Sequence, residues 1–150
     1  IDLRLKPQSG AGALVVSKDG LKEFLESSPP AWIRLAYLRS RKLGSDWTFE
    51  MTDSFKNNRL TENELKELSE MQVQLYQKAS SETDLKYSPG GILDIELSYQ
   101  SAVLMGQLPF EKKQAPLYQA LKSCGYDSLG EILYELRVTE QLHLLHGRQP

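Results

Sequence analysis

The stretch YSPGGILDIEL at residues 87–97 is the most informative part of this chain. Two adjacent glycines precede an apolar run, which predicts a turn followed by a helix that begins near Gly91. Asp94 and Glu96 lie inside that run, where an unpaired carboxylate would be costly to bury. These two acids therefore need either partners within the fold or a function that uses them.

The spacing of Asp94 and Glu96 leaves two interpretations open. On a helix, residues two apart point about 200° away from each other, so the two acids do not share a face. In the structural interpretation, Asp94 is stabilised by the helix dipole and Glu96 is solvated. In the functional interpretation both acids are used, because apolar residues surround them and indicate a helix that is buried nearly all round.

Helical periodicity extends from this stretch through most of the chain. Thr61 and Glu64 form a capping-box pattern, and Ser17 is a suitable N-cap for an earlier helix. Apolar spacing, caps and prolines predict helices after Ser17 and over 31–41, about 47–55, 61–79, 91–107, 117–123 and 128–146. The short connections favour antiparallel neighbours in a bundle.

Apolar stripes on two of these helices predict residues that enter the core. In the helix at 31–41 the stripe includes Trp32 and Leu35, and Arg34 lies mostly off it. In the last helix the apolar positions are Leu129, Ile132, Leu133, Leu136 and Leu144. We therefore expect both helices to pack with these residues inward.

Residues 1–17 have a different pattern. Isoleucine and leucine alternate with Asp2, Arg4 and Lys6, and a glycine-containing loop and a second apolar run follow, which predicts two short strands. The fold class is thus mainly α: a multi-helix bundle at residues 18–150 with an N-terminal strand pair at residues 1–17. The three charged residues share one strand face, which suits either a metal and phosphate site or a solvated edge.

Composition sets limits on the class of protein. The chain has 150 residues, 40% of them apolar, and a net charge of -2, which argues against a general nucleic-acid binder. No apolar run approaches the roughly 20 residues of a membrane span. The single cysteine, Cys124, cannot form an internal disulfide, so we expect a cytoplasmic protein. The chain lacks an initiator Met, and we expect it to be a piece of a longer protein.

Three further groups of residues each have a possible functional role and a simpler structural interpretation. Arg39 and Arg41 suit contacts with phosphate or with an acidic side chain, and they also suit a solvated helix end. His143 and His146 have a spacing that can bind metal, but no third ligand is evident, so surface histidines are favoured. Cys124 has no local activating partner and is interpreted as an incidental thiol.

Four blocks in order resemble the bacterial glutamine synthetase adenylyltransferase family (glutamate-ammonia-ligase adenylyltransferases). The most specific block, DLKYSPGGILDIE at 84–96 with a later glutamine, is similar to the family signature L-K-x-G-x-G-G-I-x-D-I-E-F-x-x-Q. DLRLKP at 2–7 resembles D-x-R-L-R-P, the segment 31–41 resembles W-E-x-x-A-L-x-R-A-R, and the segment from 136 resembles L-R-x-x-E-H-R-L-Q. The resemblance covers nearly the whole chain.

The resemblance implies a fold and a set of site residues. Family members carry nucleotidyltransferase units of the polymerase-β type, each followed by a helical bundle. Residues 1–17 would be the end of such a sheet, and residues 18–150 the helical domain. Asp2 would then be the catalytic carboxylate that holds Mg²⁺, and Arg4 and Lys6 would contact ATP or its phosphates. Asp94 and Glu96 would be acids that face the cleft from the helical side.

The resemblance also implies an activity. One unit of a family member attaches AMP to glutamine synthetase and the other removes it, which regulates nitrogen assimilation. Two further metal-binding acids of the family lie in a G-S-x-D-x-D motif that this chain lacks, so the chain alone is expected to be inactive. The -DIE- form favours the adenylylating half, and the closing -GRQ- favours the removing half.

Two other functions stay open. The first is a non-catalytic helical domain that docks glutamine synthetase or a PII-type signal protein. The second is a related uridylyltransferase-type or other polymerase-β-like enzyme with a different target.

Lys6, Ile33 and Gln141 replace the Arg, Glu and His that are usual in the family's blocks.

Overall fold

The computed structural model describes residues 16–40, 59–82, 84–109 and 116–146. Within these ranges the chain forms six α-helices and no strand: α1 (Lys18–Glu26), α2 (Ala31–Leu38), α4 (Glu62–Tyr76), α5 (Ile92–Leu104), α6 (Leu117–Ser123) and α7 (Asp127–Leu145). The prediction of a mainly helical fold is confirmed. The predicted strand pair falls almost wholly on residues 1–15, and it lies outside the described ranges together with the predicted helix at 47–55.

The first residues of α1 and α4 are capped as the sequence predicts. Ser17 Oγ accepts a hydrogen bond from the Gly20 amide at 3.1 Å. At the start of α4 the capping box is reciprocal: Thr61 Oγ1 accepts from the Glu64 amide at 3.3 Å, and the Glu64 carboxylate accepts from the Thr61 amide at 2.9 Å. These bonds satisfy amides that a helix N-terminus otherwise leaves free.

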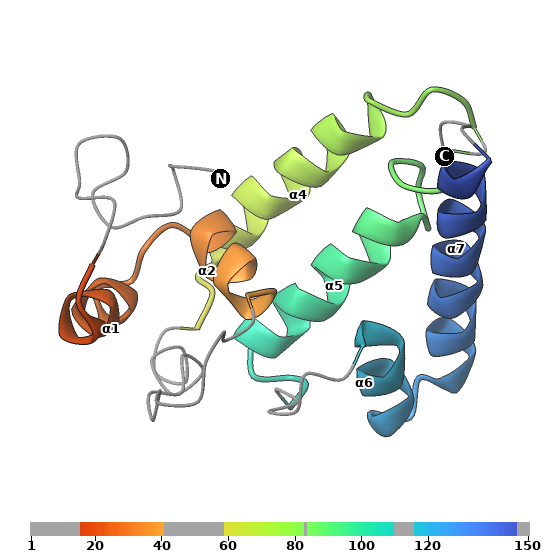
Figure 1. The fold of residues 1–150 in the computed structure, drawn as a ribbon. Helices are drawn as coiled ribbons and strands as arrows, with labels where there is room; N and C mark the ends of the chain where they lie inside the picture. Colours follow the sequence, from red (N-terminus) through yellow and green to blue (C-terminus); the bar gives the residue numbers. More distant parts are fainter. Residues whose placement is uncertain (1–15, 41–58, 83, 110–115, 147–150) are drawn as a thin grey trace.

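The helices form two groups that share α5 (Figure 1). In the first group α4 and α5 are antiparallel neighbours, and α2 packs on both of them. In the second group α6 and α7 form the most extensive helix pair, and α7 also contacts α5. None of the described helices is both long enough and apolar enough to cross a membrane.

The apolar core is divided in the same way. One cluster joins α1, α2, α4 and the end of α5 through Leu25, Ala31, Leu35, Leu68 and Leu104. The other joins α5, α6 and α7 through Ile92, Ile95, Tyr99, Ala120, Leu121 and Leu133. Because α5 supplies both clusters, it is buried on more than one side, and 6 of its 13 residues are buried. The expectation of a helix enclosed nearly all round is met.

The predicted apolar stripes are partly wrong. On α2, Trp32 is 37% exposed, whereas Arg34 is only 1% exposed. On α7, Ile132 and Leu144 are 51% and 53% exposed. The other predicted positions of α7 do face inward: Leu133 is 1% exposed, and Leu129 and Leu136 pack on the same cluster. This face also approaches α6 closely, where a Cβ on Gly130 would lie 2.7 Å from a carbonyl oxygen. Apolar spacing alone does not reveal such a contact, because it depends on the absence of a side chain.

Candidate functional site

The loop before α5 is built around the carboxylate of Asp84, which is 6% exposed. Its Oδ1 accepts hydrogen bonds from the amides of Lys86 and Tyr87 at 2.9 and 2.8 Å, and its Oδ2 accepts from the Ser80 amide at 3.0 Å. Burial alone would raise the pKa of Asp84, but these backbone hydrogen bonds outweigh it and lower the pKa to about 2. The carboxylate is therefore ionised at neutral pH and holds the loop closed.

The two positions that follow require glycine for different structural reasons. Gly90 has a φ of +76°, a left-handed conformation that favours glycine. Gly91 lies in a tight space, where a Cβ would be 2.8 Å from the Ser88 carbonyl oxygen and 2.9 Å from that of Leu85. The glycine pair thus lets the loop turn back on itself and start α5 immediately.

Asp94 closes the same turn from within the helix. Its Oδ2 accepts from the Gly90 amide at 2.7 Å, and its Oδ1 accepts from the hydroxyl of Tyr76 at 2.7 Å and from the side-chain amide of Gln72. Partial burial, and then the hydrogen bond to Asp94, raise the pKa of Tyr76. Both oxygens of Asp94 are therefore engaged inside the fold, tying α4 to the start of α5.

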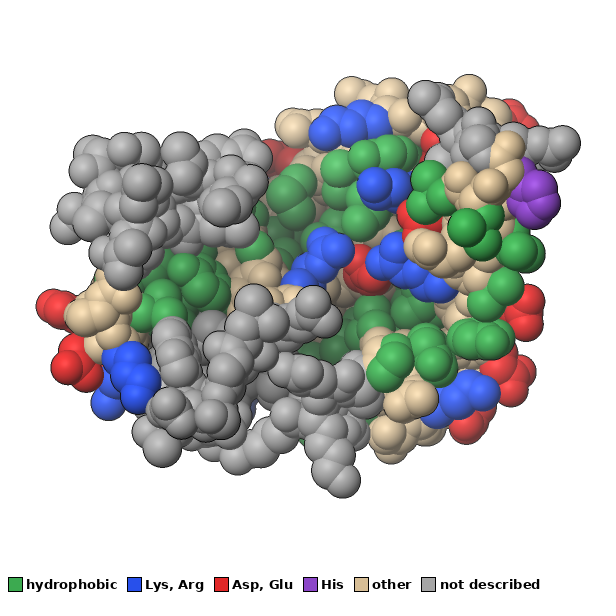
Figure 2. Space-filling model, in the orientation of Figure 1, with side chains coloured by type: hydrophobic (Ala, Val, Ile, Leu, Met, Phe, Trp, Pro, Cys, Tyr) green, Lys and Arg blue, Asp and Glu red, His purple; other side chains and the backbone are tan. Residues whose placement is uncertain are grey.

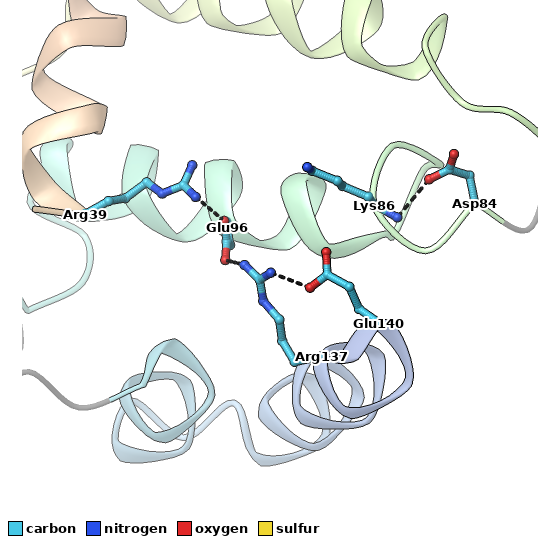
Figure 3. Close-up of polar contacts among 6 residues, drawn as sticks. All are labelled: Arg39, Asp84, Lys86, Glu96, Arg137 and Glu140. Carbon is cyan, nitrogen blue, oxygen red and sulfur yellow. Dashed lines mark hydrogen bonds and ion pairs between the residues drawn. The ribbon is translucent and has the colours of Figure 1, made fainter. Parts of the chain in front are cut away.

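Glu96 is the acid at which the two helix groups meet (Figure 3). It is 7% exposed and lies between Arg39, at the end of α2, and Arg137, on α7. Arg137 Nη2 donates a hydrogen bond to Glu96 Oε1. Arg39 Nη2 lies 3.2 Å from Glu96 Oε2, close enough for charge attraction, yet that oxygen has no hydrogen-bond partner among the described residues. One arginine is thus hydrogen-bonded to the acid, and the other is held mainly by charge.

Arg137 also binds a second acid on its own helix. Its Nη1 donates to Glu140 Oε2 at 2.7 Å, so one planar guanidinium group bridges Glu96 and Glu140. Burial alone would lower the pKa of Arg137, but the hydrogen bond to Glu140 and the charge of Glu96 outweigh it and raise the pKa. Both acids are therefore matched by a permanently charged group.

A separate buried ion pair joins α2 to α4. Arg34, which the sequence pattern places off the core, instead donates to the Glu64 carboxylate, while Glu64 also completes the capping box of α4. Burial alone would raise the pKa of Glu64, but hydrogen bonds from Thr61 and Arg34 outweigh it and lower the pKa. This pair fixes the position of α2 against the first turn of α4.

Basic side chains gather on one face of the molecule, over α5 and beside α7, around acidic side chains (Figure 2). The side chains of Arg39 and Arg137 are 50% and 38% exposed there. The Lys86 side chain extends from the loop back along α5 toward the same region (Figure 3). The backbone amide of Lys86, and not its ammonium group, donates the hydrogen bond to Asp84. This face, with Arg39, Lys86 and Arg137 around Glu96, is the candidate site.

Several predicted site residues lie outside the described ranges: Asp2, Arg4, Lys6 and Arg41. Their roles stay predictions, and so does the cleft-facing role of Asp94 and Glu96. Within the described residues no group of three or more His, Cys, Asp or Glu side chains could hold a metal ion. The carboxylates of Asp84 and Asp94 accept hydrogen bonds from within the fold, and those of Glu96 and Glu140 are paired with arginine.

The sequence pattern assigns no role to three residues of this face, Lys86, Arg137 and Glu140. Lys86, Arg137 and Glu140 belong to the resembling blocks, but no spacing predicts the contact of Arg137 with Glu96, because these two residues are 41 positions apart. Arg137 and Glu140 are spaced i, i+3 on a helix, and this spacing is the one local signal that predicts their pairing.

Comparison with known proteins supports the family resemblance. The chain is 31% identical, over 97% of its length, to the bifunctional glutamine synthetase adenylyltransferase/adenylyl-removing enzyme of Idiomarina loihiensis. It is 28% and 26% identical to the proteins of the same name from Shewanella loihica and Pseudomonas syringae pv. tomato, over 99% and 95% of the chain. No family model and no solved structure matches it.

The similarity covers a small part of each relative. The chain spans 15% of the Idiomarina and Pseudomonas proteins and 18% of the Shewanella protein. Nearly all of this chain is matched in each case, so the similarity does not depend on one short motif. The chain therefore belongs, as a region of this limited length, to the family of bifunctional glutamine synthetase adenylyltransferase/adenylyl-removing enzymes.

Proposed function

We propose that this chain is part of an enzyme that attaches AMP to glutamine synthetase, removes it, or does both, in the cytoplasm. The observation that carries the proposal is the 31% identity over 97% of the chain to a protein named for these two activities. The mainly helical structure agrees with a helical domain at residues 18–150. Residues 1–17 would be the end of the nucleotidyltransferase sheet.

The proposed division of labour rests on the resemblance. Asp2 would be a metal-binding catalytic carboxylate, and Arg4 and Lys6 would contact the phosphates of the nucleotide. Mg²⁺ bound there would stabilise negative charge on the phosphates during transfer. In this proposal the helical domain would place α5 and the basic face beside that sheet. The 150-residue chain alone is then expected to be inactive.

The test uses the complete protein that contains this chain. Purified glutamine synthetase is incubated with it, ATP and Mg²⁺, and its intact mass is measured. We expect a gain of one adenylyl group per subunit, or loss of pre-attached AMP when phosphate is supplied. Asp2→Asn should abolish the change, whereas Asp19→Asn, which removes an exposed acid at the start of α1, should not. A full mass change with Asp2→Asn would refute the assigned role of Asp2.

The alternative is a non-catalytic docking domain for glutamine synthetase or a PII-type protein. Exposed apolar side chains near the end of α7 favour it: Leu142, Leu144 and Leu145 are 48%, 53% and 81% exposed. In that case the complete protein would leave the mass of glutamine synthetase unchanged in both directions. It would still bind purified glutamine synthetase or PII protein in a calorimetric titration, and Leu145→Glu would weaken that binding.

A further inference from the structure

We infer that Arg39, Lys86 and Arg137 form a binding site for a phosphate group on the face shown in Figure 2, and that Glu96 and Glu140 hold Arg137 in place for it. The ligand class is a phosphate oxyanion, either free phosphate or the phosphate chain of a nucleotide. The inference does not rest on the proposed function, because its test measures binding to the chain itself.

Arg39 is held near Glu96, but its guanidinium group keeps N–H donors for a ligand. Its side chain is 50% exposed, and its Nη2 atom is 3.2 Å from Glu96 Oε2 without a hydrogen bond to that oxygen. A guanidinium group presents several N–H donors in one plane, which matches two oxygens of a phosphate. Charge attraction to Glu96 therefore holds Arg39 near the site and leaves donors for a ligand.

Arg137 is held more rigidly and points into the same region. Hydrogen bonds to Glu96 and Glu140 fix two of its nitrogens, while its side chain stays 38% exposed. An arginine that is already ordered loses less side-chain entropy on binding a ligand. A simple clamp between helices does not require two half-exposed guanidinium groups on one buried acid.

Lys86 supplies a third positive charge without an acidic partner among the described residues. Its ammonium group lies 5.3 Å from the centre of the Tyr87 ring, and its side chain runs back along α5 toward the two arginines (Figure 3). The nearby Asp84 carboxylate is turned to the backbone, where it binds amides and not this ammonium group. Lys86 is thus available to a ligand.

The charge balance of the cluster favours an anion. Among the groups that face one another, three cations lie around two carboxylates, Glu96 and Glu140; the third nearby carboxylate, Asp84, is turned to backbone amides. A second acidic chain is a weaker candidate than phosphate, because phosphate presents its oxygens to three cations at once. A bound phosphate group would pair with the cationic charge that Glu96 and Glu140 do not neutralise.

The experiment is a titration of the isotopically labelled 150-residue chain with sodium phosphate at constant ionic strength, followed by amide and arginine side-chain NMR shifts. We expect saturable shifts centred on Arg39, Lys86 and Arg137. Arg39→Gln should weaken binding about tenfold or more, because it removes one charge-assisted contact with the phosphate. Arg39→Lys keeps the positive charge but loses the paired N–H donors of the planar guanidinium group. It should therefore bind phosphate more tightly than Arg39→Gln and more weakly than the unchanged chain.

The matched control removes a positive charge elsewhere. Lys122→Gln takes away an ammonium group that is 41% exposed and paired with Glu131 on the α6–α7 side, and it should change the affinity less than about twofold. Arg39→Gln is chosen over Arg137→Gln because Arg39 is not hydrogen-bonded to Glu96, so the fold should survive. Unchanged melting temperature of Arg39→Gln, measured by circular dichroism, verifies this.

Separate titrations distinguish the source of the phosphate. Inorganic phosphate, AMP and ATP are compared under the same conditions. Equal affinity for phosphate and AMP assigns the site to a single phosphate group, and at least tenfold tighter binding of ATP assigns it to a nucleotide phosphate chain. Shifts that do not saturate, or an affinity that Arg39→Gln and Lys122→Gln reduce equally, would overturn the site and leave a structural ion-pair cluster only.

Discussion

Arg137 and Arg39 should differ sharply in how strongly they couple to Glu96. We propose a pair of double-mutant cycles, Glu96→Gln with Arg137→Gln and Glu96→Gln with Arg39→Gln, in which each substitution removes one charge. The Arg137 pair contains a charge-assisted hydrogen bond to an acid that is only 7% exposed. The Arg39 pair is an ion contact without a hydrogen bond and with a half-exposed cation.

The expected magnitudes follow from this difference. A net hydrogen bond to a charged group contributes about 1.5–3 kcal/mol, and exposure of part of the Arg137 side chain reduces this to a coupling of roughly 1–2 kcal/mol. For Arg39 we expect a coupling below about 0.5 kcal/mol, as for exposed ion pairs. Arg137→Gln alone should be the most destabilising single change, at about 2–3 kcal/mol, because it leaves Glu96 buried without a hydrogen-bond donor.

The assay is urea unfolding of the 150-residue chain, followed by circular dichroism, with thermal melts as a second measure. A loss of 2 kcal/mol should lower the melting temperature by about 4–8 °C in a chain of this size. The surface pair Lys122 and Glu131 gives the control cycle, with an expected coupling below about 0.5 kcal/mol. Equal coupling of Glu96 to the two arginines would refute the distinction on which the phosphate site rests.

Three other predictions concern the turn before α5 and the start of α4. Gly91→Ala should destabilise the chain by about 2–3 kcal/mol in urea unfolding, because a Cβ would lie 2.8–2.9 Å from two carbonyl oxygens. Gly90→Ala, with open space but a φ of +76°, should cost only about 1 kcal/mol. An equal or smaller cost for Gly91→Ala would contradict the close approach. Asp84 has a folded-state pKa of about 2, below its ordinary value of 3.8, so the stabilisation that its charge provides is present above pH 4 and lost as the pH falls from about 4 to 2. Asp84→Asn should therefore cost about 1–3 kcal/mol at pH 7 and little at pH 2. A cost that does not change with pH would show that the carboxylate charge is unimportant. Thr61→Ala removes the capping hydroxyl of α4 and should cost about 1 kcal/mol. Thr139→Ala in the middle of α7, where the hydroxyl caps no helix end, should cost less than about 0.5 kcal/mol. No difference between these two would argue against the capping box.

The sequence predicts the helices well because their signals are local. Ser17, the capping box at Thr61 and the glycines at 90–91 each specify a helix start through bonds that span only a few residues. The ends agree to within a few residues: the helix predicted at 91–107 is found at Ile92–Leu104, and that at 117–123 is found as predicted. The strands of residues 1–17 remain a prediction.

The candidate site is predicted only in part because its contacts are distant in sequence. Glu96 was recognised as an acid that needs partners, and Arg39 as a possible partner for an acid, but no sequence pattern joins Glu96 to Arg137. Helical spacing puts Arg34 mostly off the apolar stripe, and its burial depends on Glu64 of another helix. Pairing across helices is decided by packing, which a single sequence does not display.

The shared position of α5 has a practical consequence for dividing this chain into smaller pieces. A truncation that ends after α5 would retain the Leu104 side of the core, but it would leave Ile92, Ile95 and Tyr99 without their cover from α6 and α7. A piece that begins after α5 would lose the surface on which α6 and α7 close. Autonomous expression of either half should therefore yield aggregation-prone material, and a split version of this chain would need its two halves to be produced together.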